Sequence, residues 1–390
     1  MGIAEYMRFM PGEFEKRFAR ARELMERDNL VGLFITEGGN YTYFSGGQRD
    51  FSFSRPHILL LPRRGEPVAV VQKFVVRDRI REIWFDDVRV YQTLTGLPVA
   101  LVADLMREKG MGEGRVGAEL GYEQRLGIPF SDFSRLRKRL DQTEFMDAAD
   151  LLWEVRVIKS PEEIRRHRRA CRITVRAYEA LFPSLRAGMS EREIIERFHR
   201  LLVEMGGTEP WSFICSGPGN YNGNSSGPTD RRIRRSDLVW IDGGCTYREY
   251  ASDFCCTGTV GKPSSRQRKM QELMEEITRA VVQRVRPGIR ACELDEINNI
   301  EWKKRGYDYG EINWGGGRIG HGLGWGSCLT EPPHIASYDQ TVIRAGMVFT
   351  IEPGINTEYG SFQTEMDIAV TEEGCEILNE MDRSLRMIEG

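Results

Sequence analysis

The chain has 390 residues, a formal net charge of −3 at pH 7 and 40% hydrophobic residues. This length and composition predict a protein of two or three domains with sizeable buried cores. Because the charge is near balance, we expect no nucleic-acid partner and no affinity for an anionic membrane.

The chain carries no obvious targeting segment. Residues 1–18 include acidic side chains and lack a sustained apolar core, so we expect neither a secretory signal nor a transmembrane helix there. No later apolar run reaches the length of a membrane span, and we therefore expect a cytoplasmic protein. The eight cysteines include no Cys-x-x-Cys pair, which favours reduced core thiols over disulfides or a zinc site.

The first part of the chain alternates helix and strand patterns. Apolar residues recur at helical spacing over 11–27 and 99–109. Runs typical of strands occupy 31–36, 58–62, 67–72 and 115–120. Between them, Gly38-Gly39-Asn40 is expected to break the chain. This alternation predicts an α/β layer domain.

A domain boundary is predicted near residues 155–160, where the alternation stops. Ser160 is a good N-cap, Pro161 suits a first helical turn, and Glu163 completes a capping box, so a helix should run to about residue 185. Ser190 and Glu193 repeat the pattern for a helix that ends near residue 205. We therefore predict an N-terminal domain over 1–158 and a second domain over 159–390.

The second domain is predicted to be rich in strands. Strand patterns occupy 211–216, 237–242, 347–352, 360–365 and 367–371, with a further helix over 266–285. A turn over 246–252 should fold Asp253 back against Asp242, which we expect at the end of its strand. The segment 313–326 is so rich in glycine that we expect no regular element in it.

Five residues of this domain are candidate metal ligands. Asp242, Asp253, His321, Glu352 and Glu365 each lie in or near an apolar or glycine-rich run. Taken singly, Asp-Gly often ends a strand and a lone histidine is more often a core residue. Taken together, buried carboxylates call for a cation, and oxygen and imidazole ligands suit Mn, Fe, Co or Zn. The combination predicts a site for a pair of divalent metal ions.

The order of these motifs carries a resemblance to a known family. Asp242-Gly-Gly, Asp253, Gly320-His321-Gly, Glu352-Pro-Gly and Glu365 resemble the metal-ligand series of the prolidase, aminopeptidase P and creatinase family, the "pita-bread" metallopeptidases. Segments 159–164 and 185–191 resemble the helices that open that family's catalytic domain, and 14–46 resembles its N-terminal domain. The resemblance implies an α+β homodimer. Each chain would have a creatinase-type α/β domain and a pita-bread domain with a curved antiparallel sheet.

The resemblance also implies roles for the five residues. All five would bind two metal ions, with Asp253 and Glu365 as the bridging carboxylates. A water activated by the cations would attack a carbonyl carbon, while Glu352 orients it and moves its proton. Glu352 and His321 are thus the predicted catalytic residues.

The chain departs from the family pattern next to these ligands. The family usually has a histidine in the loop before the first aspartate, where this chain has Asn224-Ser225-Ser226-Gly227. It usually has His-Glu-x-Pro where Thr330-Glu331 stands, and often arginine in place of Gln363. Losing two histidines should weaken stabilisation of a tetrahedral intermediate, so we expect an altered substrate. We predict substrate contacts from Asn224, Thr330, Glu331, Gln363 and Trp325.

Three functions remain as hypotheses. The first is a metal-dependent hydrolase of a small amide or an Xaa-Pro-type peptide bond, with a short peptide or small molecule as its substrate. The second is a lyase acting on a small onium acid such as dimethylsulfoniopropionate, because aromatic residues flank the motifs and can hold a cation. The third is a non-catalytic binding protein. The retained ligand residues argue against it, and also against a metal-independent, creatinase-like hydrolase.

Overall fold

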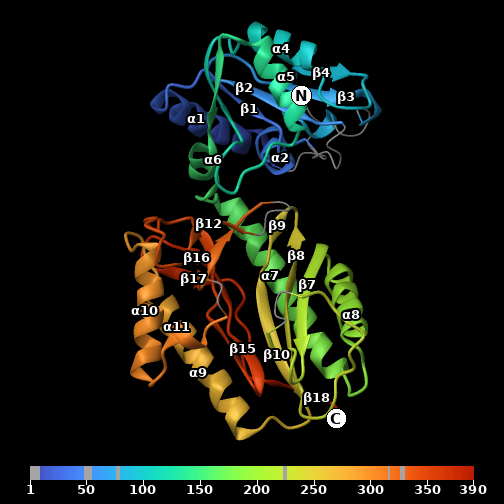
Figure 1. Cartoon of the computed structure of the whole chain (residues 1–390), viewed down its shortest axis with the longest axis vertical. Coiled ribbons are helices and arrows are strands. Elements are labelled where there is room, and N and C mark those ends of the chain that lie inside the picture. The colour runs from blue at the N-terminus through green and yellow to red at the C-terminus, as the bar shows by residue number, and fades with distance from the viewer. Residues whose placement is uncertain (1–8, 48–54, 76–79, 223–225, 315–316, 326–329) are drawn as a thin grey trace. The chain divides into compact units, whose positions relative to one another are not determined.

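The computed structural model describes residues 9–47, 55–75, 80–222, 226–314, 317–325 and 330–390. The chain divides into two compact units, Met1–Arg156 and Val157–Gly390 (Figure 1). Within the described ranges, no helix combines the length and the apolar character needed to cross a bilayer.

The first unit is a mixed sheet flanked by helices. The strands are hydrogen-bonded in the order β4-β3-β2-β1-β5-β6, and β1, β5 and β6 run parallel to one another. Phe34 and Val116 of this sheet pack against Val102 and Met106 in one buried cluster. The strands are β1 (Gly32–Ile35), β2 (Ile58–Pro62), β3 (Val68–Gln72), β4 (Val88–Tyr91), β5 (Gly114–Ala118) and β6 (Thr143–Asp147). The helices are α1 (Pro11–Arg27), α2 (Gly38–Ser45), α4 (Val99–Glu108), α5 (Phe130–Arg139) and α6 (Ala149–Arg156). The predicted α/β layer domain is confirmed.

One local prediction in this unit is wrong. Gly38-Gly39-Asn40 does not break the chain but forms the first turn of α2. The Glu37 carboxylate caps this turn by accepting the Asn40 N–H at 2.9 Å. The buried Glu119 carboxylate accepts the N–H groups of Thr36 and Glu37, each at 2.8 Å. Side-chain oxygens thus accept the backbone N–H groups around the helix start. These hydrogen bonds offset the low helix propensity of the two glycines.

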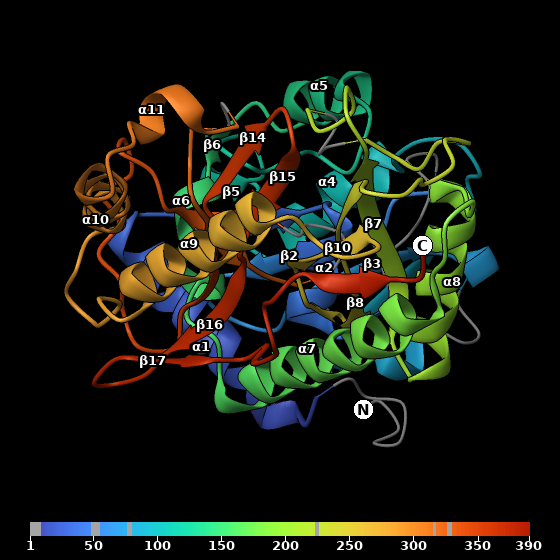
Figure 2. The same cartoon turned by 90° about the horizontal axis from the view of Figure 1, so that it is seen from below.

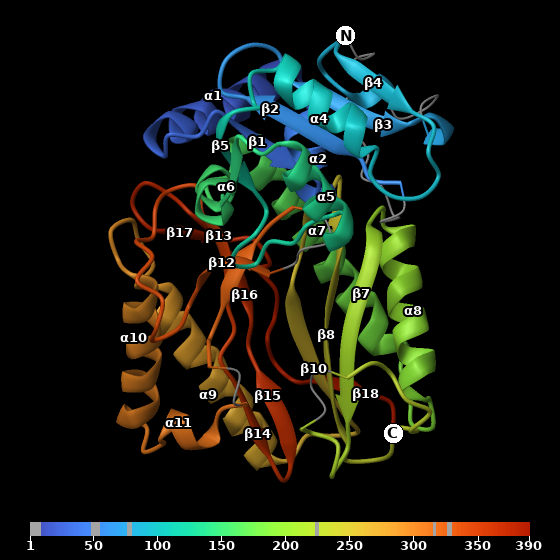
Figure 3. The ribbon, with the colours of Figure 1, turned by 45° about the horizontal axis from the view of Figure 1, so that its top comes forward.

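Capping boxes define the helices that open the second unit. Ser160 accepts the Glu163 N–H and Glu163 returns a hydrogen bond to the Ser160 N–H, as predicted, and Ser190 and Glu193 do the same. The helices are α7 (Pro161–Leu181), α8 (Glu191–Glu204), α9 (Ser265–Val282), α10 (Ala291–Lys304) and α11 (Tyr309–Ile312). Helix α8 lies alongside β7, as Figures 2 and 3 show.

Antiparallel strands form the sheets of the second unit, as predicted. One sheet has the order β18-β10-β8-β7, with β9 paired to β8, and a second has the order β12-β11-β13-β16-β17. Strands β14 and β15 form a separate hairpin, and among the described strands of this unit only β10 and β18 pair in parallel. The strands of the first sheet are β7 (Thr208–Ser216), β8 (Leu238–Tyr247), β9 (Tyr250–Ala251), β10 (Phe254–Val260) and β18 (Arg386–Ile388). The others are β11 (His321–Leu323), β12 (Thr330–His334), β13 (Val348–Ile351), β14 (Gly354–Thr357), β15 (Gly360–Gln363), β16 (Met366–Val370) and β17 (Cys375–Ile377).

Strand β8 is longer than predicted. It does not end at Asp242 but continues to Tyr247, and Asp242 lies opposite Cys255 of β10. The turn is confined to Arg248 and Glu249, whose φ angles are 50° and 74°. Two central residues with positive φ make a tight hairpin turn that matches the strand twist. Because neither residue is glycine or asparagine, the sequence carried no signal for this turn.

The glycine-rich segment also differs from its prediction, because it contains strand β11. The glycines permit close packing of the chain rather than preventing a strand. A Cβ atom at Gly320 would lie 2.1 Å from the Thr350 carbonyl oxygen, and one at Gly322 would lie 2.2 Å from the Pro332 oxygen. Close approach to neighbouring backbone therefore requires glycine at both positions.

Candidate metal centre

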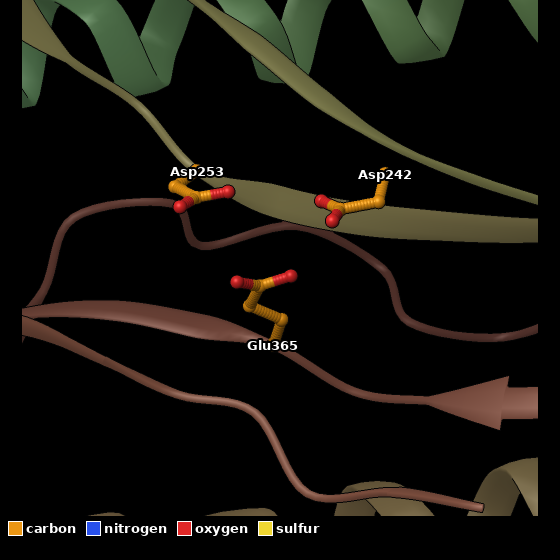
Figure 4. A group of neighbouring side chains, drawn as sticks. All are labelled: Asp242, Asp253 and Glu365. Carbon is orange, nitrogen blue, oxygen red and sulfur yellow. The ribbon is translucent and has the colours of Figure 1, made fainter. Parts of the chain in front are cut away.

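Three carboxylates from separate segments meet inside the second unit. Asp242 projects from the middle of β8, Asp253 from the link between β9 and β10, and Glu365 from the link between β15 and β16. Figure 4 shows the three carboxyl groups directed toward one another. One oxygen from each residue lies within 4.8 Å of the oxygens chosen from the other two. The structure thus brings together three of the five predicted ligands through carboxylates alone.

The environment of these carboxylates is poor in hydrogen-bond donors. Asp253 is 5% exposed and Glu365 is fully buried. Within the described part of the chain, Asp242 Oδ1 and both Glu365 oxygens accept no hydrogen bond. Burial, followed by the charges of neighbouring acids, raises the pKa of all three carboxyl groups well above their usual range. Buried oxygens that lack donors and face one another form a donor set that fits a hard divalent cation.

His321 adds an imidazole nitrogen to this set. Its Nδ1 lies 3.1 Å from the Gly322 carbonyl oxygen, which can only accept, so Nδ1 carries the proton. Burial lowers the pKa of His321, so the ring is neutral and Nε2 presents a lone pair. Nε2 lies 3.4 Å from Asp253 Oδ2 and 3.3 Å from Glu352 Oε1. An imidazole nitrogen beside two carboxyl groups is a mixed nitrogen and oxygen donor set, so this group also fits a divalent cation.

Glu352 lies at the more open side of the cluster and is held by neutral groups. Its side chain is 18% exposed. Thr350 Oγ1 donates to Oε1 at 3.2 Å, and Gln363 Nε2 donates to Oε2 at 3.1 Å. The orientation of Glu352 is therefore set by a hydroxyl and an amide.

The residues predicted to contact substrate have the following surroundings. Gln363 is 2% exposed and bridges Glu352 to the Trp240 indole, which donates to its Oε1 at 3.2 Å. Glu331 is 1% exposed and forms an ion pair with Lys159. Trp325 is 2% exposed and packs edge-to-face on Tyr250, with ring centroids 5.0 Å apart. Thr330 begins β12 opposite Leu323, and Asn224 lies outside the described residues. Gln363 thus contacts Glu352 and Trp240, and Glu331 contacts Lys159.

Some residues near the centre were missing from the predicted set. Asp367 is a fully buried acid on β16, and its pKa is raised to about 7, chiefly by burial. Thr350 orients Glu352 and also accepts the His321 N–H at 3.2 Å. An acid inside the apolar run 366–370 was a visible signal for Asp367. Thr350 has no such signal, because a threonine in a strand is ordinary.

Comparison with known proteins identifies the class to which this fold and site belong. The model of metallopeptidase family M24 matches residues 165–372, and that of the creatinase/prolidase N-terminal domain matches residues 17–158. The first match spans more than half of the chain and includes all five predicted ligands. The chain therefore belongs to metallopeptidase family M24, whose members use divalent metal ions to hydrolyse peptides. The predicted family resemblance and the predicted metal-dependent hydrolase are confirmed.

Within this family, the chain is similar to proteins named Xaa-Pro dipeptidase or prolidase. The chain is 35% identical to the Xaa-Pro dipeptidase of Pyrococcus horikoshii over 269 residues, which cover 68% of this chain and 74% of that protein. It is 27% identical to the Xaa-Pro dipeptidase of Lactobacillus helveticus over 373 residues, covering 95% and 98% of the two chains. A solved prolidase from Thermococcus sibiricus superposes with a TM-score of 0.85 at 27% identity, covering 96% and 99%.

Proposed function

We propose that this protein hydrolyses Xaa-Pro-type bonds in short peptides with two divalent cations, held by Asp242, Asp253, His321, Glu352 and Glu365. The supporting observation is the meeting of Asp242, Asp253 and Glu365, with oxygens within 4.8 Å of one another and few donors around them. The names of the relatives support the bond type. The ligand chemistry suits Mn, Fe, Co or Zn.

Individual residues have distinct roles in the proposed hydrolysis. Cations bound at such a centre polarise the substrate carbonyl and lower the pKa of a water molecule. Glu352 accepts a proton from the attacking water and passes it to the leaving amine, because its carboxylate side chain is 18% exposed and can reach both. Gln363 and Thr350 hold its two oxygens in place for this transfer. His321 remains neutral and serves as a ligand through Nε2.

The remaining alternatives have less support. The relatives named above are peptidases, and no observation on the described residues favours a lyase that acts on an onium acid. Edge-to-face packing of Trp325 on Tyr250 provides a structural explanation for one of the aromatic residues that motivated that hypothesis. The homodimer and the cytoplasmic location stay predictions.

The proposal is tested by metal analysis and matched substrates. Purified protein supplied with Mn, Fe, Co or Zn should cleave an Xaa-Pro dipeptide and leave the corresponding Xaa-Ala dipeptide largely intact. Asp253→Ala should lose both metal and activity, whereas Glu372→Ala, which removes an exposed carboxylate, should retain both. Full activity of metal-free Asp253→Ala would refute the proposal. An alkene product without solvent oxygen would establish the lyase instead.

A further inference from the structure

Asp367 is a buried acid next to the candidate metal centre to which the proposed mechanism assigns no role. It lies on β16, two residues after Glu365, and its side chain is fully buried. Its Oδ2 accepts the backbone N–H of Asp253 at 3.1 Å and the Cys171 thiol of α7 at 3.2 Å. Asp367 therefore connects β16, the strand that follows Glu365, to the backbone of Asp253.

The Asp253 amide needs this acceptor. Asp253 falls between β9, which ends at Ala251, and β10, which begins at Phe254, so the strand ladder is interrupted at this residue. A buried backbone N–H without an acceptor costs about as much free energy as a lost hydrogen bond. The Asp367 carboxylate supplies this acceptor, and the hydrogen bond fixes the backbone position of Asp253.

The other end of this connection is also held rigidly. The Glu365 carbonyl oxygen accepts Arg383 Nη1 at 2.7 Å and Asn379 Nδ2 at 3.2 Å. Asn379 Oδ1 accepts the Asp367 N–H at 3.2 Å. Asn379 and Arg383 are both buried. Asn379 and Arg383 thus hold the backbone of residues 365–367 in place. Because this segment is fixed, the Asp367 side chain holds Asp253 at a set distance from Glu365.

We propose that Asp367 is a positioning residue of the metal centre, which sets the placement of Asp253 relative to Glu365 by accepting the Asp253 N–H. This inference rests on the proposed function, because both residues are proposed bridging ligands. Groups that orient metal ligands typically contribute 10- to 100-fold to metal affinity. The role requires an oxygen acceptor at this position. It does not require the carboxylate to bind the metal.

The test compares Asp367→Ala with Asp367→Asn, because the amide retains one oxygen that can accept the Asp253 N–H. Mn²⁺ affinity of the full chain is measured by competition with a chelating dye, and the melting temperature of each metal-free variant reports folding separately. We expect Asp367→Ala to bind Mn²⁺ about 10- to 100-fold more weakly and Asp367→Asn to recover most of that loss. Cys171→Ala removes the other donor to Oδ2 and leaves the Asp253 bond intact, so it should bind Mn²⁺ like the wild type.

The outcomes separate this inference from the function on which it rests. Wild-type affinity in a folded Asp367→Ala variant would overturn the positioning role while leaving the proposed function standing. So would an Asp367→Asn variant as weak as Asp367→Ala, because the charge rather than the acceptor would then matter. If Asp367→Ala does not fold, the comparison of Asp367→Asn with Cys171→Ala decides, and a large loss in the former overturns the role. A wild-type protein that binds no divalent ion contradicts the proposed function itself.

Discussion

A buried ion pair supports the strand that carries His321, and breaking it should be costly. Lys159 and Glu331 form this pair with side chains that are 3% and 1% exposed. Lys159 precedes α7, and Glu331 on β12 is the pairing partner of Gly322, next to His321. The ion pair therefore joins the start of the second unit to β12, which pairs with the strand that carries His321.

The expected magnitude follows from the burial of both partners. Removing one member of a buried pair leaves an uncompensated charge and typically costs about 3–5 kcal/mol. For a domain of this size, each kcal/mol lowers the melting temperature by about 2–4 °C, so Lys159→Met should lower it by about 6–20 °C. Replacing both partners, as in Lys159→Met with Glu331→Leu, should restore most of the lost stability, because neither member of the pair is then left in the core without the other.

Urea unfolding and thermal melts of the two single variants and the double variant measure these differences. Lys304→Met is the matched control, since Lys304 is 60% exposed in its pair with Glu301 and should contribute no more than about 1 kcal/mol. A Lys159→Met variant as stable as the control would refute the reasoning. A double variant whose loss equals the sum of the two single losses would refute it as well.

Three further predictions follow from single contacts. Glu352→Gln should bind metal with modest loss but lower kcat by about 10²- to 10⁴-fold, because the amide cannot accept a proton; steady-state kinetics with an unchanged kcat would contradict this role. Gly324→Ala should destabilise the protein, because the added Cβ would lie 1.9 Å from Glu331 Oε2, whereas Gly227→Ala meets nothing within 4 Å and should be neutral in the same melt. Burial raises the pKa of Glu119 to about 7 from 4.5, so the stability that its protonated form contributes is full below pH 4.5 and is lost as the pH rises through 7. That loss amounts to about 3 kcal/mol. Glu119→Gln should flatten this decline in urea midpoints between pH 5 and 8, and equal slopes for both proteins would count against it.

Features that depend on neighbouring residues in the chain were predicted from the sequence. The capping boxes at Ser160 and Ser190 lie within four residues each, and both helices begin where expected. The α/β alternation of the first unit follows from apolar periodicity, which depends on burial of one face at a time. The antiparallel sheet of the second unit was implied by the family resemblance. The family was evident from the order of the ligand motifs.

Features that depend on contacts between distant segments were not predicted. Helix α2 starts on glycines, and just before it the N–H groups of Thr36 and Glu37 donate to Glu119, some eighty residues away. Likewise, Gln363 donates to Glu352 and accepts from the Trp240 indole, and its predicted contact with substrate stays a prediction. In both cases a polar group found its partner through the fold, and no local pattern encodes that pairing.

The sequence by itself determined which residues are candidate metal ligands, because the residue type and the surrounding apolar runs set their chemistry. Only the tertiary structure decided what surrounds them. Asp367, Gln363 and the Lys159–Glu331 pair each satisfy a buried polar group contributed by a distant segment, which for Gln363 is the Trp240 indole. A buried polar atom must find a partner wherever the packed chain provides one, so these supporting residues become visible only when the strands are brought together.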